Sequence, residues 1–128
     1  MNEKDSKLYN LEFDEKPDYL YAYVSSDKVS LDVSRQYWRE IADQCQQTKC
    51  RKVLIVEDIK ESVSTTETYQ MASEIPGMDF SGIKIAFVDQ YIEQHAVNEF
   101  GALVSTNRGL NIKLFNTVEE AEKWLLSK

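Results

Sequence analysis

The amino-acid sequence predicts an α/β fold, with a mostly parallel sheet, an antiparallel N-terminal hairpin, the order ββαβαβαβα and helices packed on the sheet. Two short alternating segments lie close together near the N-terminus, as in a hairpin. Two nearly continuous apolar runs, KVLIVE (Lys52–Glu57) and IKIAFVD (Ile83–Asp89), are typical of strands buried on both faces. Segments with apolar residues at helical spacing separate these strands. Strands that alternate with helices in this way form a parallel sheet through right-handed crossovers.

The hairpin is predicted from two segments of period-two alternation and the turn between them. Leu8–Phe13 and Tyr19–Ser25 alternate as strands do. Pro17 and Asp18, which favour turns, stand between them. The short connection indicates that the two strands run antiparallel.

The first two helices are predicted from apolar stripes and capping residues. The first runs from about Asp32 to Thr48, with Ser30 or Asp32 as its N-cap. Its stripe recurs at three- and four-residue steps and consists of Tyr37, Trp38, Ile41, Ala42 and Cys45. The second runs from about Ser64 to Ile75, because the Pro76-Gly77 that follows cannot continue a helix.

The C-terminal third predicts a helix, a strand and a last helix. The helix spans Tyr91–Thr106, with Gly109 near its C-terminus, and is expected to bury Ile92, Ala96, Phe100 and Leu103. Leu110–Phe115 alternates between apolar and polar residues, which favours a place toward a sheet edge. Thr117 and Glu120 form a capping box that begins the last helix, whose expected buried stripe is Val118, Ala121, Trp124 and Leu125.

Length and charge limit the classes of function. A chain of 128 residues fits one domain over 1–128, with 1–7 expected to be flexible. A net charge of −7 without a basic stripe argues against nucleic-acid binding. The charged N-terminus has no apolar signal segment, and no stretch approaches the about 20 apolar residues that span a bilayer. We therefore expect a cytoplasmic protein without membrane insertion.

Two cysteines and one histidine are too few for a four-ligand zinc site, so neither metal nor cofactor is predicted. Cys45 is expected to be a buried thiol and Cys50 a thiol at the end of a helix.

A cluster of hydroxyl side chains follows the buried strand Lys52–Glu57. It consists of Ser62, Ser64, Thr65 and Thr66. One interpretation is structural, because Ser64 and Glu67 have the spacing of a capping box. The other is a phosphorylated switch. A phosphate-binding loop is disfavoured, since the segment lacks glycine and follows the acids Glu57 and Asp58. A response-regulator receiver is also disfavoured, because too few strands follow VLIVED.

The order of elements, with a hydroxyl-rich turn after the buried strand, resembles the STAS family. The chain is similar to stand-alone bacterial SpoIIAA-like proteins of the STAS and CRAL-TRIO type, over roughly residues 8 to 127. The C-terminal segment NRGLNIKLFNTVEEAEKWL contributes to this resemblance at Asn107, Gly109, Phe115, Ala121, Trp124 and Leu125.

The resemblance implies a non-enzymatic regulatory domain that binds a protein partner, with no catalytic residue. Its recognition surface would be the loop Asp58–Thr66 and the helix after it, with Asp58, Ser62, Ser64, Thr65 and Thr66 as candidate residues. In the related antagonists a serine at this helix start is phosphorylated, which makes Ser62 or Ser64 the candidate here. Their Asp-Ser-Ser-Gly-like motif is replaced by KESVST, which has no glycine.

Three other possibilities stay open. Tyr19, Tyr21 and Tyr23 point to one face of their strand. They pack under a helix or face a small apolar ligand, as in lipid-binding CRAL-TRIO relatives. An enzyme would use Glu57 and Asp58 as general acid and base, although the sequence offers no second catalytic group. A homodimer through an exposed helix or sheet edge is compatible with the sequence, which selects no surface for it.

Overall fold

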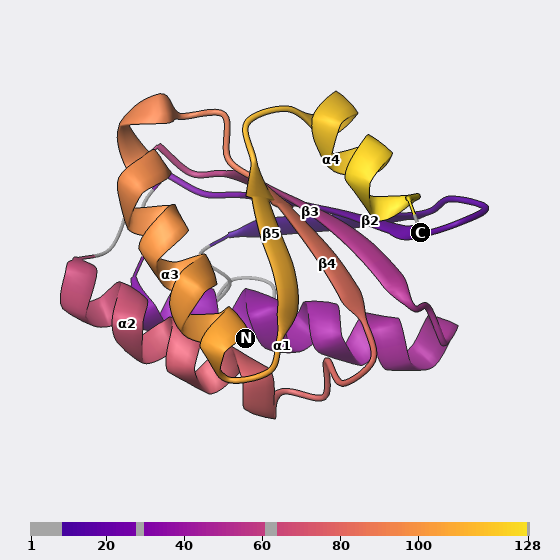
Figure 1. Cartoon of the computed structure of the whole chain (residues 1–128), viewed down its shortest axis with the longest axis horizontal. Helices are drawn as coiled ribbons and strands as arrows, with labels where there is room; N and C mark the ends of the chain where they lie inside the picture. The colour runs from indigo at the N-terminus through magenta and orange to yellow at the C-terminus, as the bar shows by residue number, and fades with distance from the viewer. Residues whose placement is uncertain (1–8, 28–29, 61–63, 128) are drawn as a thin grey trace, which may run out of the picture.

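The computed structural model describes residues 9–27, 30–60 and 64–127, so the prediction for residues 1–7 lies outside the described residues. These residues form one five-stranded sheet with strands in sequential order (Figure 1). The first two strands pair antiparallel and all other neighbours pair parallel. The strands are β1 (Asn10–Glu15), β2 (Leu20–Ser25), β3 (Lys52–Asp58), β4 (Lys84–Val88) and β5 (Asn111–Phe115). The predicted fold class is confirmed, and β5 is an edge strand as expected.

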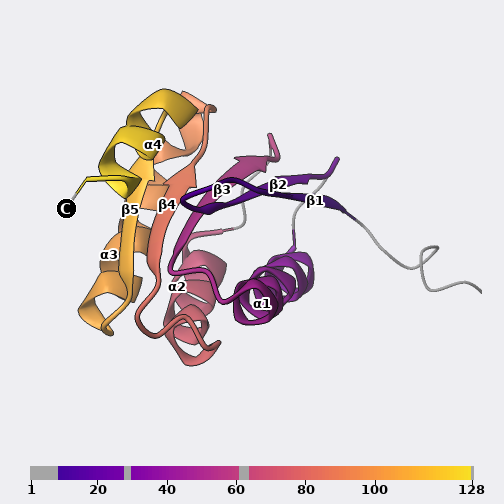
Figure 2. The ribbon, with the colours of Figure 1, turned by 90° about the vertical axis from the view of Figure 1, so that its right-hand side faces the viewer.

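Three helices cover one face of the sheet and the fourth covers the other (Figure 2). Strands added in sequence through right-handed crossovers place all the crossover helices on one face. The last helix follows the last strand and packs on β3 and β4 from the opposite side. None of the helices in the described part is long and apolar enough to cross a bilayer. The helices are α1 (Leu31–Thr48), α2 (Thr65–Glu74), α3 (His95–Asn107) and α4 (Val118–Leu125), with 3₁₀ turns at Ile75–Gly77 and Ile92–Gln94.

Side-chain hydrogen bonds cap the N-termini of α1 and α4 at residues that the sequence predicts. The Ser30 hydroxyl accepts a hydrogen bond from the Val33 N–H at 3.2 Å, so Ser30 rather than Asp32 caps α1. The Thr117 hydroxyl accepts from the Glu120 N–H at 3.2 Å and caps α4 in the same way. Each bond satisfies a backbone donor that the first helical turn leaves free.

The sheet separates two apolar cores, because successive residues of each strand point to opposite faces. On the face of α1, α2 and α3, the large buried side chains include Leu20, Tyr37, Ile41, Ile55 and Ile85. On the face of α4, the core is smaller and consists of Tyr19, Leu54, Val56, Ala86, Val88, Ala121 and Leu125.

The predicted buried stripe of α3 is wrong. Ile92 and Leu103 are 74% and 58% exposed, and Ala96 and Phe100 are exposed as well. The inward face instead carries Gln94 of the preceding 3₁₀ turn and, from α3 itself, Asn98, Gly101, Val104 and Ser105, of which only Val104 is a large apolar residue.

Two features explain why this face of α3 turns inward. A Cβ at Gly101 would lie only 3.1 Å from Thr68 Cγ2, so glycine lets α3 approach α2 closely. The Ser105 hydroxyl donates a hydrogen bond of 2.8 Å to the Ala72 carbonyl oxygen of α2. Close packing and hydrogen bonding to α2 and the sheet outweigh the burial of the apolar stripe.

Candidate functional site

The hydroxyl cluster begins α2 as the structural interpretation predicts. The Ser64 hydroxyl accepts a hydrogen bond from the Glu67 N–H, and the Glu67 carboxylate accepts one from the Ser64 N–H, both at 3.2 Å. This capping box satisfies two free backbone donors. Thr65 and Thr66 are exposed in the first turn. Ser62 lies outside the described residues.

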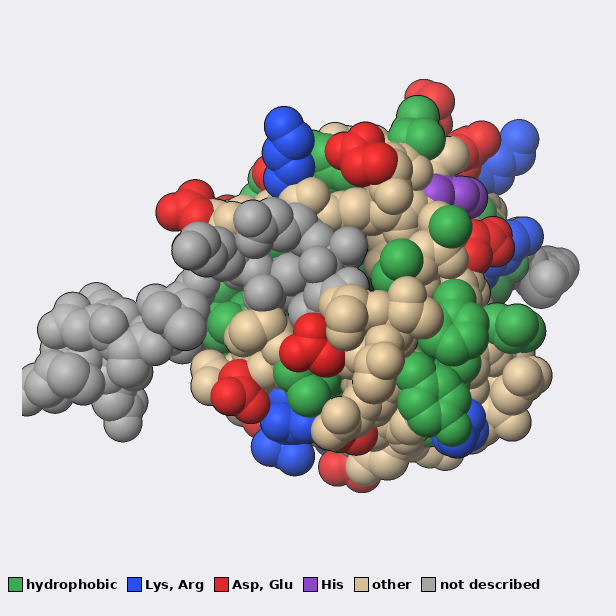
Figure 3. Space-filling model, turned by 90° about the vertical axis from the view of Figure 1, so that its left-hand side faces the viewer, with side chains coloured by type: hydrophobic (Ala, Val, Ile, Leu, Met, Phe, Trp, Pro, Cys, Tyr) green, Lys and Arg blue, Asp and Glu red, His purple; other side chains and the backbone are tan. Residues whose placement is uncertain are grey.

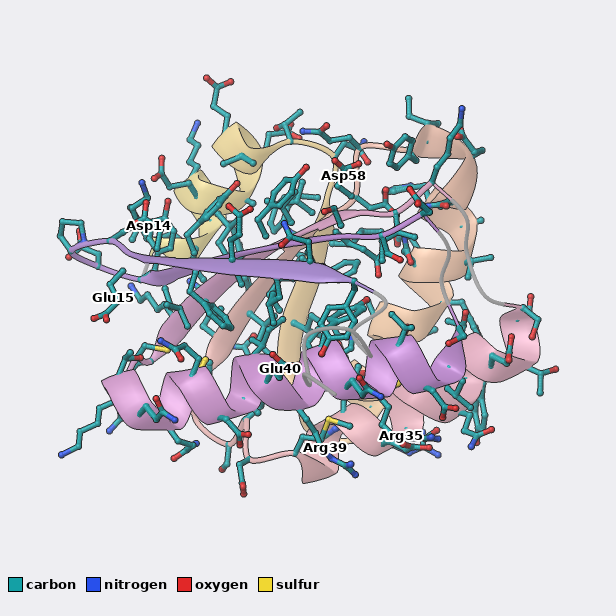
Figure 4. The ribbon with its side chains drawn as sticks, turned by 180° about the vertical axis from the view of Figure 1, so that it is seen from behind. Asp14, Glu15, Arg35, Arg39, Glu40 and Asp58 are labelled. Atoms are coloured by element: carbon teal, nitrogen blue, oxygen red, sulfur yellow. The ribbon has the colours of Figure 1, made fainter. Side chains whose placement is uncertain are left out.

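Asp58 lies on the α4 side of the sheet (Figure 4), where two tyrosines bind it. It accepts hydrogen bonds from the Tyr23 hydroxyl and, at 2.7 Å, from the Tyr91 hydroxyl. These bonds lower the pKa of the Asp58 carboxyl below its ordinary value, mainly through Tyr23. Asp58 therefore joins β2, β3 and the segment before α3 at the carboxyl end of the sheet.

The three tyrosines of the second strand share one face, as predicted, and that face is the α4 side. The Tyr19 hydroxyl donates a hydrogen bond of 2.8 Å to Glu122 of α4, and burial together with this bond raises the pKa of Tyr19 to about 12. Tyr19 and Tyr21 also border an open surface hollow beside Pro17. A ligand at this face stays a prediction.

Glu57 and Asp58 are not brought together, since neighbouring residues of a strand point to opposite faces. Glu57 points toward α1, where it accepts a hydrogen bond from the Tyr37 hydroxyl. The carboxyl group beside Glu57 is Asp89, one residue beyond β4. Val56 pairs with Val88, so Glu57 and Asp89 follow at the same level on neighbouring parallel strands.

Asp89 is a buried acceptor, only 1% exposed. Its carboxylate accepts hydrogen bonds from the Tyr91 N–H at 2.9 Å, the Gln94 amide at 2.7 Å and the Asn98 amide at 2.6 Å. The Gln94 amide also donates to the Ile59 carbonyl oxygen at 3.1 Å. The segment before α3 and Asn98 of α3 together therefore hold Asp89.

A cavity of about 90 Å³ lies between the sheet and the three helices beside Glu57. Its walls are mostly apolar and include Trp38, Met71, Ile75, Phe87 and Leu114. Its polar lining groups are Ser34, Tyr37, Glu57, Thr68, Asn98 and Ser105. Glu57 is surrounded by protein, yet part of its surface stays accessible, because its side chain lines this cavity.

The environment of Glu57 makes it unusual among the carboxyl groups. Burial raises its pKa from 4.5 to about 7, the Tyr37 hydrogen bond opposes this shift, and the negative charge of Asp89 adds to it. No lysine or arginine of the described residues forms an ion pair with Glu57 or Asp89. Nor do these two acids belong, within the described residues, to a group of three or more side chains that could hold a metal ion.

Sequence reasoning missed Asp89 and the cavity. The signal for Asp89 was present, because it ends the apolar run Ile83–Asp89 just as Glu57 ends the run Lys52–Glu57. Polar side chains at the ends of adjacent parallel strands meet at one sheet edge. The cavity depends on side-chain packing, which no spacing pattern predicts.

No protein-family model matches the chain, and a search of curated proteins finds no match either. The resemblance to the STAS family therefore stays a prediction.

Proposed function

We propose that this chain is a protein-binding domain that uses the outer surface of α2 and α3. We define the α2–α3 surface as Tyr69, Ile92, Phe100 and Leu103, which are 36% to 74% exposed. One further large apolar side chain among the described residues, Leu126, is exposed. Contiguous exposed apolar side chains are characteristic of interaction sites. This unpartnered face is the observation that carries the proposal.

The surface is continuous across the two helices. The rings of Tyr69 and Phe100 stack with centroids 6.3 Å apart. Figure 3 shows hydrophobic side chains gathered on the side of the molecule where these helices lie. Thr65 and Thr66 extend this surface toward the loop Asp58–Thr66, so the proposed site overlaps the recognition surface expected from the STAS resemblance.

Charge selects the class of partner. Glu93 and Glu99 are exposed beside the apolar residues, and the whole chain carries −7. The positive charge of Arg108 is already engaged within this surface. Its guanidinium lies over the Tyr69 ring, 5.5 Å from the ring centroid, and donates a hydrogen bond of 3.2 Å to the Tyr69 hydroxyl. A second copy of this acidic chain would be repelled. We therefore assign the surface to an amphipathic, basic helix of another protein.

Two helical peptides with the same leucine spacing test this assignment, one with Lys and Arg on its polar face and the other with Glu and Asp. In amide NMR spectra of the full chain, the resonances of α2 and α3 should shift when the basic peptide is added and should not shift when the acidic peptide is added. Leu103→Asp should weaken that binding at least about tenfold, which corresponds to about 1.4 kcal/mol. Leu126→Asp, which introduces the same charge at an exposed leucine of the α4 end, should leave it unchanged.

Three results would contradict the proposal. The first is that neither peptide binds, and the second is that both peptides bind equally well. The third is that the Leu103→Asp variant binds the basic peptide as tightly as the parent does. Sedimentation of the parent and Leu103→Asp proteins tests a homodimer: a dimer that this substitution dissociates would assign the surface to a second copy instead.

A phosphorylation switch in the loop Asp58–Thr66 is a separate part of the proposal. A phosphate on Ser64 would be esterified to the same side-chain oxygen that caps α2, whereas Ser62 lies outside the described residues. Intact-mass measurement after incubation with candidate kinases tests this part alone. Absence of a phosphate on both serines would remove the switch and leave the binding surface intact.

A further inference from the structure

We propose that the cavity between the sheet and α1, α2 and α3 binds a small organic cation, such as a primary ammonium ion of three or four heavy atoms. The lining of this cavity shares no residue with the α2–α3 surface, so the inference goes beyond the proposed function. It rests on the cavity, on the carboxyl groups beside it and on the aromatic rings in its wall.

The formal charges of the described residues next to the cavity are negative. Glu57 is the one carboxyl group among the described residues that line it, and no lysine or arginine is among them. Asp89 stands beside Glu57, so the second formal charge nearby is also negative. Arg35 of α1 does not compensate, because its guanidinium binds Glu74 of α2 through two hydrogen bonds of 2.8 and 2.9 Å. Buried charges are normally paired, and a bound cation would supply the missing partner.

The walls fit the organic part of such an ion. The rings of Trp38 and Phe87 stack with centroids 5.7 Å apart, and both line the cavity. Aromatic rings attract alkylammonium ions and pack against their carbon atoms. Among the lining residues of the described chain there is no basic group to repel a cation.

The volume limits the size of the ligand. A cavity of about 150 Å³ accommodates benzene, with six heavy atoms. The cavity here, about 90 Å³, therefore fits three or four heavy atoms. Thr68, Asn98 and Ala102 of its lining are only half-buried, so it lies close to the surface between α2 and α3.

Binding should depend on pH, because the cation needs the ionised form of Glu57. Among the described residues, the other titratable groups that face Glu57 are acids: Tyr37 from α1 and Asp89 from the end of β4. The lining residues of α2, α3 and β5 carry no charge. The affinity for a cation should therefore rise with pH and level off above the titration of Glu57.

Three probes of similar size test the proposal on the full chain: propylammonium, 1-propanol and propionate. Isothermal titration and amide NMR at about pH 8 should show saturable binding of propylammonium, with shifts centred on Trp38, Phe87 and Asn98. Binding at about pH 6 should be roughly tenfold weaker, because about one tenth of Glu57 is then ionised. Propanol and propionate should bind at least about tenfold more weakly than propylammonium.

Three variants separate the site from general charge effects. Glu57→Gln should weaken propylammonium binding at least about tenfold. Glu122→Gln removes the same charge on the opposite face of the sheet, beside Tyr19, and should bind like the parent. Ala102→Met fills the cavity while Glu57 remains, and should also abolish binding, which keeps the test valid if Glu57→Gln fails to fold.

The proposal is overturned if propylammonium does not saturate, if propionate or propanol binds as tightly, or if binding survives both Glu57→Gln and Ala102→Met. Shifts confined to exposed carboxylates would likewise show surface association in place of the proposed site.

Discussion

The Tyr37 hydroxyl of α1 donates a hydrogen bond to the Glu57 carboxyl group at the end of β3. Tyr37 is only 1% exposed, so this bond forms inside the helix-covered core. It ties the first helix to the central strand at the point where the cavity begins. The two residues therefore link the packing of the domain to the protonation of one carboxyl group.

Stability should depend on pH through Glu57. Its folded-state pKa, about 7, lies above the ordinary value of 4.5. The stability contributed by the protonated group is therefore fully present below about pH 4.5, falls as the pH rises toward 7 and is absent above it. The total change is up to about 3 kcal/mol. Urea unfolding of the chain over this range measures the free energy directly.

Glu57→Gln should remove most of this dependence, because glutamine keeps the shape without titrating. At about pH 8 the variant should be more stable than the parent, and near pH 4.5 the two should be similar. Glu122→Gln is the control and should follow the parent profile. Parallel curves for Glu57→Gln and the parent would show that another group is responsible.

Ser64→Ala should cost about 1 kcal/mol of unfolding free energy, because it removes the hydroxyl that caps α2. Ser64→Asp should keep the cap, since aspartate is also a favourable N-cap residue. Thr66→Ala, at an exposed position of the same turn, should have little effect. Equal losses at Ser64 and Thr66 would refute the capping role.

The two cysteines should differ in reactivity. Hydrogen bonding between the two thiols lowers the pKa of Cys50, whereas the same interaction and burial raise the pKa of Cys45 well above its ordinary value. The thiolate is the nucleophile, so iodoacetamide at neutral pH should alkylate Cys50 first. Mass spectrometry of the alkylated parent and Cys50→Ser proteins measures the order of labelling. Equal labelling of both native thiols would contradict the predicted difference in reactivity.

The contact between α2 and α3 should appear as coupling between Gly101 and Thr68. Alanine is favoured over glycine inside a helix by about 1 kcal/mol, but its Cβ would lie 3.1 Å from Thr68 Cγ2. Gly101→Ala should therefore gain more stability in a Thr68→Ala background than in the parent. A double-mutant cycle measures this difference, and strict additivity would argue against the close contact.

Much of the fold was predictable because several independent signals agree. The apolar runs Lys52–Glu57 and Ile83–Asp89 specify the two central strands, and β3 and β4 pair in parallel as expected. Ser64 and Thr117 begin helices where their spacing to a glutamate indicates. Burial of the two central strands and helix capping are local or binary patterns, which a single sequence records directly.

The error at α3 has a different origin. Ile92, Ala96, Phe100 and Leu103 form an apolar stripe, and helical spacing alone cannot tell an inward stripe from an outward one. Which face of the helix turns inward depends on two tertiary contacts. Asp89 accepts hydrogen bonds from the amides of Gln94 and Asn98, and Gly101 allows α2 to pack closely. These contacts fix the orientation of α3 about its own axis, and the same orientation leaves the residues of the α2–α3 surface exposed.

The central claim is that the Glu57 carboxyl group, which has no cationic partner among the described residues, lies beside a cavity under the helices. Carbon-detected NMR titration of the Glu57 side-chain carboxyl tests it most directly. A midpoint near pH 7, absent from the spectrum of Glu57→Gln, is the predicted result. A midpoint near the ordinary value of 4.5 would mean that Glu57 is solvated or paired, and would contradict both the pH predictions and the cation site.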